Sequence, residues 1–439
     1  MAFVVLCSLV GVPALYAQTV DTARLTLGAI LAAAERASPR VEATRASARA
    51  AAARVGVAMR RPDPEVQFGL MNFEIPRVRP MPAVGMVQVQ VMQMIPLGGK
   101  LRLGGEVASA RADAATHRIE EAVVEVRART AEAFYELYAA DMTLTVARES
   151  KRLVTDLVAI ARRMYEVGEG RQADVLRASV ELARMDEEVV RIETMQTVYR
   201  TRLNALLGRA PDAPIGVPLL PSFATDPLPL DSLVRIAESN RPMIRAGLQE
   251  TRAASLASEL ARRESRPDFQ VGFQLGVLPT AAMPGMEDNQ LMASIMVGTT
   301  IPFFGKRGLA AMRDETAAMR AMADADVGAM RLETRGAVAE VYADLLRARR
   351  LAAHHRSSIL PQAEANVASA LAAYRASTVD FSTMLDAQVA LSKFRMELYM
   401  LDAEQGKAWA ELEMLTGQRL IDVDATRPSR EPFGGSSND

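Results

Sequence analysis

The sequence predicts a mainly α-helical chain with a small β part, built from two tandem copies of one unit. The first observation is the repeat itself: Arg61-Pro62-Asp63 returns as Arg266-Pro267-Asp268, and Gly99-Lys100 returns as Gly305-Lys306. The second is the composition, which is rich in helix-forming residues and only 5% aromatic. The third is a set of four short segments in which apolar and polar residues alternate. Such a duplication is typical of a repeat architecture and not of a single-pocket enzyme.

The N-terminus has the features of an export signal. Residues 1–17 carry no charge and hold an apolar run that ends in small residues before Gln18. We therefore expect residues 1–17 to be a signal peptide. The alternative, a transmembrane anchor, would need about 20 apolar residues, and this run is shorter. Cys7, the single cysteine of the chain, lies in this segment, so we expect a mature chain without thiols, disulfides or a lipid anchor.

The rest of the chain divides into two repeats and a tail. We expect the first repeat over residues 18–215, the second over 216–421, and a disordered tail rich in Pro, Ser, Gly and Asn over 422–439. Each repeat opens with an amphipathic helix, over Leu25–Met59 and Leu230–Arg263. Both helices end at an Arg-Pro-Asp triplet, because the residue before a proline is disfavoured in helical geometry.

Two strands follow the opening helix of each repeat. The alternating pattern predicts strands at about 65–75, 86–96, 268–278 and 290–301. One face of each strand is apolar, whereas the other carries Gln, Gly, Ser and Met with very little charge. This pattern is typical of a sheet that faces lipid on one side and a water-filled lumen on the other. The alternative is a soluble sheet with one buried face. The candidate lumen methionines are Met71, Met92, Met94, Met292 and Met296.

The strand number predicts an assembly. Four strands cannot close on themselves, and in hydrocarbon each unpaired backbone group at an open edge costs several kcal/mol. Two copies would give eight strands, whose interior is filled by side chains, whereas three copies would give twelve and leave a passage. The sequence therefore favours a trimer with a twelve-stranded β-barrel.

Two long helices complete each repeat. We expect helices at about 102–164 and 173–207 in the first repeat, and at about 307–374 and 382–416 in the second. Some sixty residues of helix span roughly 90 Å, more than an ordinary domain. Apolar residues of the return helices follow the three-and-four spacing of a coiled coil, and Gln196 and Gln405 occupy the same place in it. Pro361 is expected to kink the second long helix.

No pattern in the sequence indicates catalysis. His117 and Glu120 share one helical face, a fragment of a metal site, but the second repeat has no match, which favours a solvated face. A nucleophile, base and orienting group do not occur as a recognisable set, and no Gly-rich phosphate loop follows a strand. We therefore expect no enzyme activity, no cofactor and no metal centre. The net charge of −1 also argues against nucleic acid as a partner.

Taken together, the motifs resemble those of the TolC-like outer membrane efflux family. They are the strand pair, Pro-Leu-Gly-Gly-Lys or Pro-Phe-Phe-Gly-Lys, the long helix, the tip after Tyr165 or Tyr374, and the heptad helix. The resemblance runs from about Leu25 to Ile421. It implies a homotrimer with a barrel in the lipid of the outer membrane and a periplasmic α-barrel. It also implies two partners, a periplasmic adaptor (membrane fusion) protein and an inner-membrane pump, which we expect to be of the RND type.

The same resemblance implies a gate at the hairpin tips. In this family, acidic side chains at the tips help to close the periplasmic entrance, and Asp386 matches one of them by its distance from Tyr374. The neighbouring family position is Thr383 here, so the acidic ring is thinner. The remaining candidate gate residues are Asp380, Asp174 and Arg177, and the alternative for each is a solvated charge. The candidate adaptor-docking residues of the tips are Tyr165, Val167, Gly168, Glu169, Tyr374, Ser377 and Thr378.

The sequence leaves the exported substrate open. The chain has 24 methionines, thioethers bind soft cations such as Cu(I), and the Pro-Leu-Gly-Gly-Lys run resembles the heavy-metal (CusC and CzcC) branch of the family. The alternative is that methionine is a flexible filler of packed surfaces. We expect a passive conduit for small molecules or metal ions in a tripartite efflux system. The alternatives are the outlet of a type I protein secretion system and a periplasmic coiled-coil scaffold without channel activity.

Overall fold

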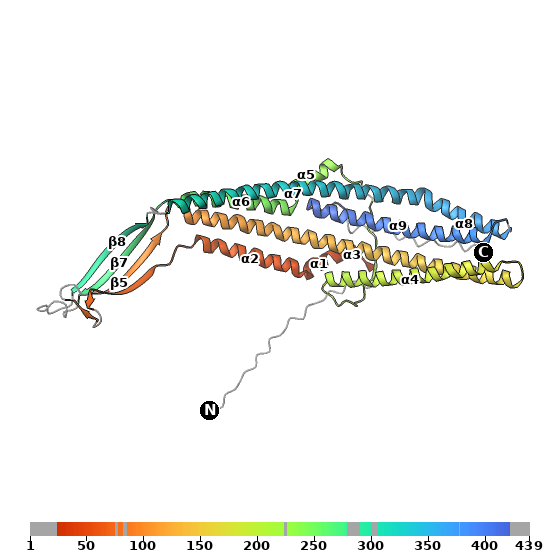
Figure 1. Cartoon of the computed structure of the whole chain (residues 1–439), viewed down its shortest axis with the longest axis horizontal. Coiled ribbons are helices and arrows are strands. Elements are labelled where there is room, and N and C mark those ends of the chain that lie inside the picture. Colours follow the sequence, from red (N-terminus) through yellow and green to blue (C-terminus); the bar gives the residue numbers. More distant parts are fainter. Residues whose placement is uncertain are drawn as a thin grey trace, which may run out of the picture.

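The computed structural model describes residues 24–74, 78–81, 86–223, 226–278, 290–300, 305–376 and 378–421. These residues form an elongated molecule with a β-sheet at one end and the ends of two helical hairpins at the other (Figure 1). The predicted fold class, mainly helical with a small β part, is confirmed. The expected signal peptide, the expected C-terminal tail and Ser377 lie outside the described residues.

Both repeats contain equivalent elements in the same order, although the first long hairpin helix is continuous only in the first repeat. The first contains α1 (Leu27–Ala37), α2 (Pro39–Met59), β2 (Glu65–Met71), β5 (Met86–Ile95), α3 (Lys100–Glu166) and α4 (Gln172–Leu206). The second contains α5 (Leu230–Asn240), α6 (Pro242–Arg263), β7 (Asp268–Leu278), β8 (Gln290–Thr300), α7 (Lys306–His354), α8 (Leu360–Arg375) and α9 (Phe381–Thr416). The sequence did not predict two further pairs of short strands, β1 (Arg24–Leu25) with β6 (Val217–Pro218), and β3 (Phe73–Glu74) with β4 (Arg79–Pro80).

The sheet contains both strand pairs in the order β2-β5-β7-β8, with every neighbour antiparallel. Val66 pairs with Val91 in the first hairpin, and Val271 pairs with Val297 in the second. The two hairpins therefore share one register, offset by 205 residues in the first strand and 206 in the second. The β5–β7 pairing joins the repeats and leaves β2 and β8 at the edges of the sheet.

Each opening helix is divided in two, and the expectation of a single helix over Leu25–Met59 was wrong. The structure has α1 and α2 there, and the second repeat is divided in the same way. The second helix of each pair begins at a proline, Pro39 or Pro242. Proline has no backbone N–H and forces the preceding residue into an extended conformation, with ψ of 114° at Ser38 and 121° at Arg241. The repeated proline therefore breaks the helix at the same place twice.

The second long helix is interrupted next to Pro361. A π-helical turn, η2 (His355–Ile359), separates α7 from α8. In this turn the Leu360 N–H donates to the His355 carbonyl, five residues earlier. The helical hydrogen bonds are thus rearranged beside Pro361, which has no N–H to donate. Arg356 of this turn donates a hydrogen bond to Asp402 of α9, which is buried. Among the described residues, no helix is both long enough and apolar enough to cross a membrane.

The helices form one layer, in which α3 has neighbours on both sides. Near the sheet the order is α2, α3, α6, α7, whereas toward the hairpin ends α3 lies between α4 and α9. The main hydrophobic core lies where the opening helices meet the long helices. A repeated ion pair marks these contacts: Glu35 of α1 meets Arg127 of α3 at 2.6 Å, and Glu238 of α5 meets Arg335 of α7. The duplication is therefore preserved in the side-chain contacts as well as in the sequence.

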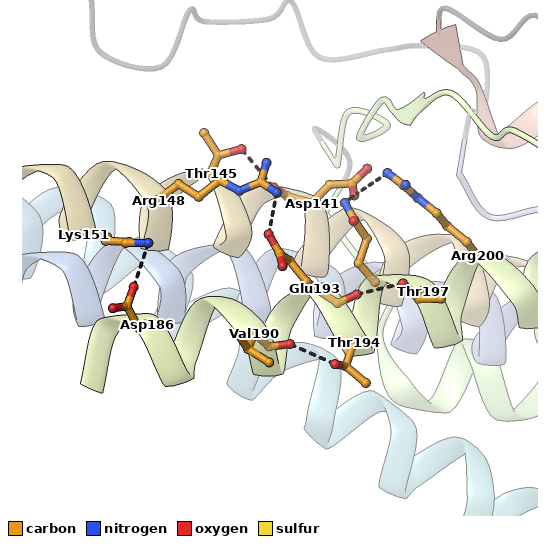
Figure 2. A network of polar contacts seen from close by, with 11 residues as sticks. Asp141, Thr145, Arg148, Lys151, Asp186, Val190, Glu193, Thr194, Thr197 and Arg200 are labelled. Atoms are coloured by element: carbon orange, nitrogen blue, oxygen red, sulfur yellow. Dashed lines mark hydrogen bonds and ion pairs between the residues drawn. The ribbon is translucent and has the colours of Figure 1, made fainter. Parts of the chain in front are cut away.

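A buried carboxylate joins the two helices of the first hairpin. Figure 2 shows Asp141 of α3 together with residues of α4. The Gln196 side-chain amide donates a hydrogen bond to Asp141 Oδ1, and Arg200 Nη2 lies 3.5 Å from the same oxygen. The coiled-coil position of Gln196 is polar because its amide satisfies this carboxylate. Burial raises the pKa of the Asp141 carboxyl, against the smaller opposing effects of Gln196 and Arg200. Within the described part of the chain, Asp141 Oδ2 has no hydrogen-bond partner.

We expect Asp141 to make the stability of the chain depend on pH. Its pKa is higher in the folded than in the unfolded chain, so its contribution is fully present below the unfolded pKa and is lost as pH rises through the folded pKa. The difference in the free energy of unfolding between wild type and Asp141→Asn, measured against pH by helical circular dichroism, should therefore change across this window. Asp186→Asn is the matched control, because it removes the same charge from the exposed pair with Lys151. Parallel curves for wild type and Asp141→Asn would contradict the assignment.

Candidate functional site

The ends of the two helical hairpins lie together, far from the sheet (Figure 1). The α3–α4 hairpin and the α8–α9 hairpin share a small hydrophobic cluster there, with Ala161 and Ala178 from the first and Phe381 and Leu385 from the second. The Tyr374 ring packs edge-on against the Phe381 ring, with centroids 5.8 Å apart. The candidate gate residues of both repeats are therefore carried on one packed unit.

The turn of the first hairpin depends on glycine. Gly168 has φ of 77°, a left-handed conformation that other residues rarely adopt. Its N–H donates to the Tyr165 carbonyl at 3.1 Å, and the Glu169 N–H donates to the Met164 carbonyl at 2.9 Å. A side chain at Gly170 would come within 2.8 Å of the Tyr165 backbone nitrogen. The two glycines let the chain reverse direction tightly and present residues 165–169 at the tip.

The turn of the second hairpin uses a threonine instead. The N–H and the hydroxyl of Thr378 both donate to the Ala373 carbonyl at 2.9 Å. This satisfies a carbonyl that the end of α8 leaves without a helical partner. The Thr383 N–H then donates to the Asp380 carbonyl at 3.0 Å where α9 begins. Two different local chemistries therefore produce equivalent turns in the two repeats.

Two arginines of the first hairpin meet two aspartates of the second. Arg177 Nη2 of α4 lies 2.9 and 2.8 Å from the two carboxylate oxygens of Asp386 on α9. Arg171, just before α4, lies 3.6 Å from Asp380, just before α9. All four side chains are more than half exposed. Each pair is therefore in high dielectric and is worth about 0.2–1 kcal/mol.

The structure thus brings most of the predicted gate residues together, and it pairs one of them, Asp380, with Arg171, which the sequence did not indicate. Arg171 was missed, because nothing in its own repeat marks it as the partner of a residue more than 200 positions away. Asp174 lies in the first turn of α4, close enough that its charge, after the larger effect of burial, raises the pKa of the Tyr374 hydroxyl. Thr383 is exposed on the first turn of α9.

An exposed apolar strip runs along the first hairpin near its tip. Val167 is 68% exposed, Tyr165 is 48% exposed, and Leu176 and Val180 follow on one face of α4. Glu169 adds a charge at the apex. The second hairpin buries Leu385, the counterpart of Leu176, and leaves it only 2% exposed. The two tips therefore present different surfaces, and the apolar one belongs to the first repeat.

The five candidate lumen methionines lie on one face of the sheet. The registers place Met71, Met92, Met94, Met292 and Met296 on the side that also carries the Gln residues of the strands other than Gln93. A side chain at Gly272 would lie 3.3 Å from Met92 and 3.5 Å from Met296, so these two methionines cover the glycine. The opposite face carries apolar residues that remain exposed, with Phe68 at 80% and Ile295 at 77%.

The family of the chain follows from comparisons with known proteins. A family model described as "Outer membrane efflux protein" matches residues 30–209 and 233–418, one match in each repeat. No curated protein is detectably similar in sequence.

Solved structures share the fold. VceC of Vibrio cholerae superposes with a TM-score of 0.73 at 16% identity, covering 90% of this chain and 96% of that one. The Campylobacter jejuni CmeC outer membrane channel gives 0.72 at 14% identity over 90% and 87%. CusC gives 0.76 at 14% identity over 90% and 92%. The chain belongs to the outer membrane efflux protein family, whose members are channels and not enzymes.

Proposed function

We propose that this chain is the outer membrane channel of a tripartite efflux system and acts as a passive conduit to the outside. The observation that carries the proposal is the family match in both repeats, combined with a molecule that has its sheet at one end and its helical hairpins at the other. The exposed apolar face of the sheet also supports it, because a soluble sheet would bury such a face. This disfavours the alternative of a periplasmic scaffold.

The proposed conduit is a homotrimer. β2 and β8 are the edges of a four-stranded sheet, and their unpaired backbone groups would be costly in lipid. Three copies joined edge to edge would form a twelve-stranded barrel, with the apolar face toward lipid and the Gln and Met face toward the passage. Below the barrel, the helices of the three copies would continue the passage through the periplasm.

The proposed gate is the pair of ionic contacts at the hairpin ends. Arg177 with Asp386, and Arg171 with Asp380, hold the two hairpins of one chain together. Because the pairs are exposed and weak, a docking partner or a change in charge can separate them at little cost. Strong buried pairs would not allow such a transition.

The proposed partners are a periplasmic adaptor protein and an inner-membrane pump of the RND type. The exposed apolar strip of the first tip, which includes Val167 and Tyr165, supports adaptor docking there, since apolar patches of this kind mark protein interfaces. The substrate is a small molecule or a metal ion. The methionines beside the Gln residues favour soft cations as one class, because thioethers bind them.

We expect loss of the ionic gate to increase the current. In planar bilayers, Asp386→Ala and Arg177→Ala should each raise the open probability several-fold, because each removes a pair worth about 0.2–1 kcal/mol in every copy. Arg148→Ala is the matched control, since it removes a similarly exposed pair with Glu193 away from the tips. Currents that are equal in wild type and both tip variants would place the gate elsewhere.

We expect docking to be separable from conduction. Val167→Asp places a charge in the apolar strip at the first tip, and it should reduce export by cells at least several-fold, because an unpaired charge in an interface is costly. The same variant should conduct normally in bilayers, since Val167 makes no gate contact. Cellular export of a fluorescent substrate and single-channel recording give the two readouts. Normal export by this variant would exclude Val167 from the docking surface.

A further inference from the structure

One lysine at the junction of sheet and helices is buried among acceptors. Lys100, the first residue of α3, is 8% exposed. Its Nζ lies 2.9 and 3.0 Å from the carboxylate oxygens of Asp268, 3.0 Å from the Arg266 carbonyl and 3.6 Å from Glu264. Asp268 also accepts the Leu97 N–H at 3.1 Å. The lysine of the first repeat is thus held by the Arg-Pro-Asp triplet of the second, which fixes α3 against β7.

The duplication supplies a second set of these groups. Lys306 is the first residue of α7, as Lys100 is of α3, and Asp63 belongs to the first Arg-Pro-Asp triplet, as Asp268 belongs to the second. The offsets of 206 and 205 residues that relate these groups are the offsets that relate the two strand registers. The equivalence therefore rests on the structure of the sheet as well as on the sequence.

The second set is not assembled within one chain. Lys306 is exposed, and its side chain makes no hydrogen bond or ion pair with another described residue. Among the residues that the structure describes, Asp63 pairs only with its neighbour Arg60, at 2.6 Å, and both side chains are more than two-thirds exposed. Lys306 follows β8 and Asp63 precedes β2, so they stand at opposite edges of the sheet. No rearrangement within a single chain of this fold brings them together.

The helices beside these edges also lack a neighbour. α6, which packs between α3 and α7, buries seven residues, whereas its counterpart α2 buries only Val41 and Ala48. In the fully described stretch Lys306–Met330 of α7, Val327 is the only buried residue. The matching stretch of α3 buries Lys100, Leu103 and several alanines. The outer sides of α2 and α7 are therefore exposed. The equivalent sides of their counterparts, α6 and α3, are buried against each other within the chain.

We propose that Lys306 of one copy is held by Asp63 of the next copy, in the way that Lys100 is held by Asp268 within the chain. This inference rests on the proposed homotrimer and names its subunit contact. The contact joins two different surfaces head to tail, and such contacts close into a ring when the rotation fits. The intrachain α3–β7 junction shows how the equivalent lysine and aspartate pair when the two strands are neighbours.

The same equivalence fixes the strand register between copies. Within the chain, Val91 of β5 pairs with Phe273 of β7. The repeat offsets convert this pair into Val297 of β8 and Phe68 of the neighbouring β2. Both side chains lie on the apolar face, so the intersubunit pairing keeps that face continuous. A slip of one residue would place Met296 opposite Phe68 and reverse the faces.

Cross-linking tests the contact directly. In a Cys7→Ser background, full-length protein with Asp63→Cys and Lys306→Cys is treated in membranes with a short bifunctional thiol reagent. Species of two and three chain masses should form. The matched control, Lys100→Cys with Asp268→Cys, should react but stay at the mass of one chain. Phe68→Cys with Val297→Cys should also give intersubunit products, whereas Phe68→Cys with Met296→Cys should not.

A charge exchange tests the energetic role. Lys306→Glu should lower the fraction of trimer after dilution in detergent by on the order of ten-fold, because two carboxylates then face each other in a buried site. Adding Asp63→Lys should restore the trimer. Arg307→Glu is the matched control, since it makes the same charge change one residue later, where the counterpart Leu101 makes no ion pair.

The results separate this contact from the function. If the protein forms a conducting trimer but Asp63→Cys and Lys306→Cys do not join chains, the proposed contact is wrong and the channel proposal stands. If the purified chain neither forms trimers nor carries current, the channel proposal fails and this inference fails with it. If the exchanged pair does not restore a trimer that Lys306→Glu alone has lost, the ion pair is excluded as the cause.

Discussion

The packing of other helices along α3 is the constraint on which the rest of the structure depends. A helix of 67 residues is about 100 Å long, and it is stable only where an apolar face is buried along its length. The buried residues of α3 are largely alanines and other small side chains, which let α2, α6, α4 and α9 approach closely. Because α3 belongs to the first repeat and α6 and α9 to the second, this packing also joins the two repeats into one body.

Duplication gives the repeats the same elements but different positions. The first long helix lies inside the layer, whereas α7 lies at its edge near the sheet. α7 is also the helix that is interrupted, by the π-turn before Pro361. The two tips reverse the chain by different means, with glycines in one and Thr378 in the other, and only the first carries an exposed apolar strip. In the proposed conduit, the edge position of α7 is available for contact with the next copy. The apolar strip of the first tip is available for contact with an adaptor.

Chemically similar ion pairs in this chain differ in burial, and therefore in how firmly they hold their elements together. At the junction with the sheet, Lys100 is buried with Asp268, so loss of either partner would remove the nearest opposite charge of the other. At the hairpin ends, Arg177 and Asp386 meet at similar distances but in water, where the net stabilisation is small. The buried pair is suited to a permanent joint. The exposed pair is suited to a contact that opens and closes.

The sequence alone determined the elements and their order, because periodicity, prolines and the repeat are local properties. Alternation identified the strands, and the repeated Arg-Pro-Asp triplet marked where helix gives way to strand. Pro39 and Pro242 carried the signal for the divided helices, although the periodicity alone suggested continuity. Only the tertiary structure decided which groups meet. Arg177 and Asp386 are 209 residues apart, and their contact depends on how two hairpins pack side by side. No local pattern encodes that geometry, nor does any local pattern show that Lys100 is enclosed while Lys306 is left at an edge.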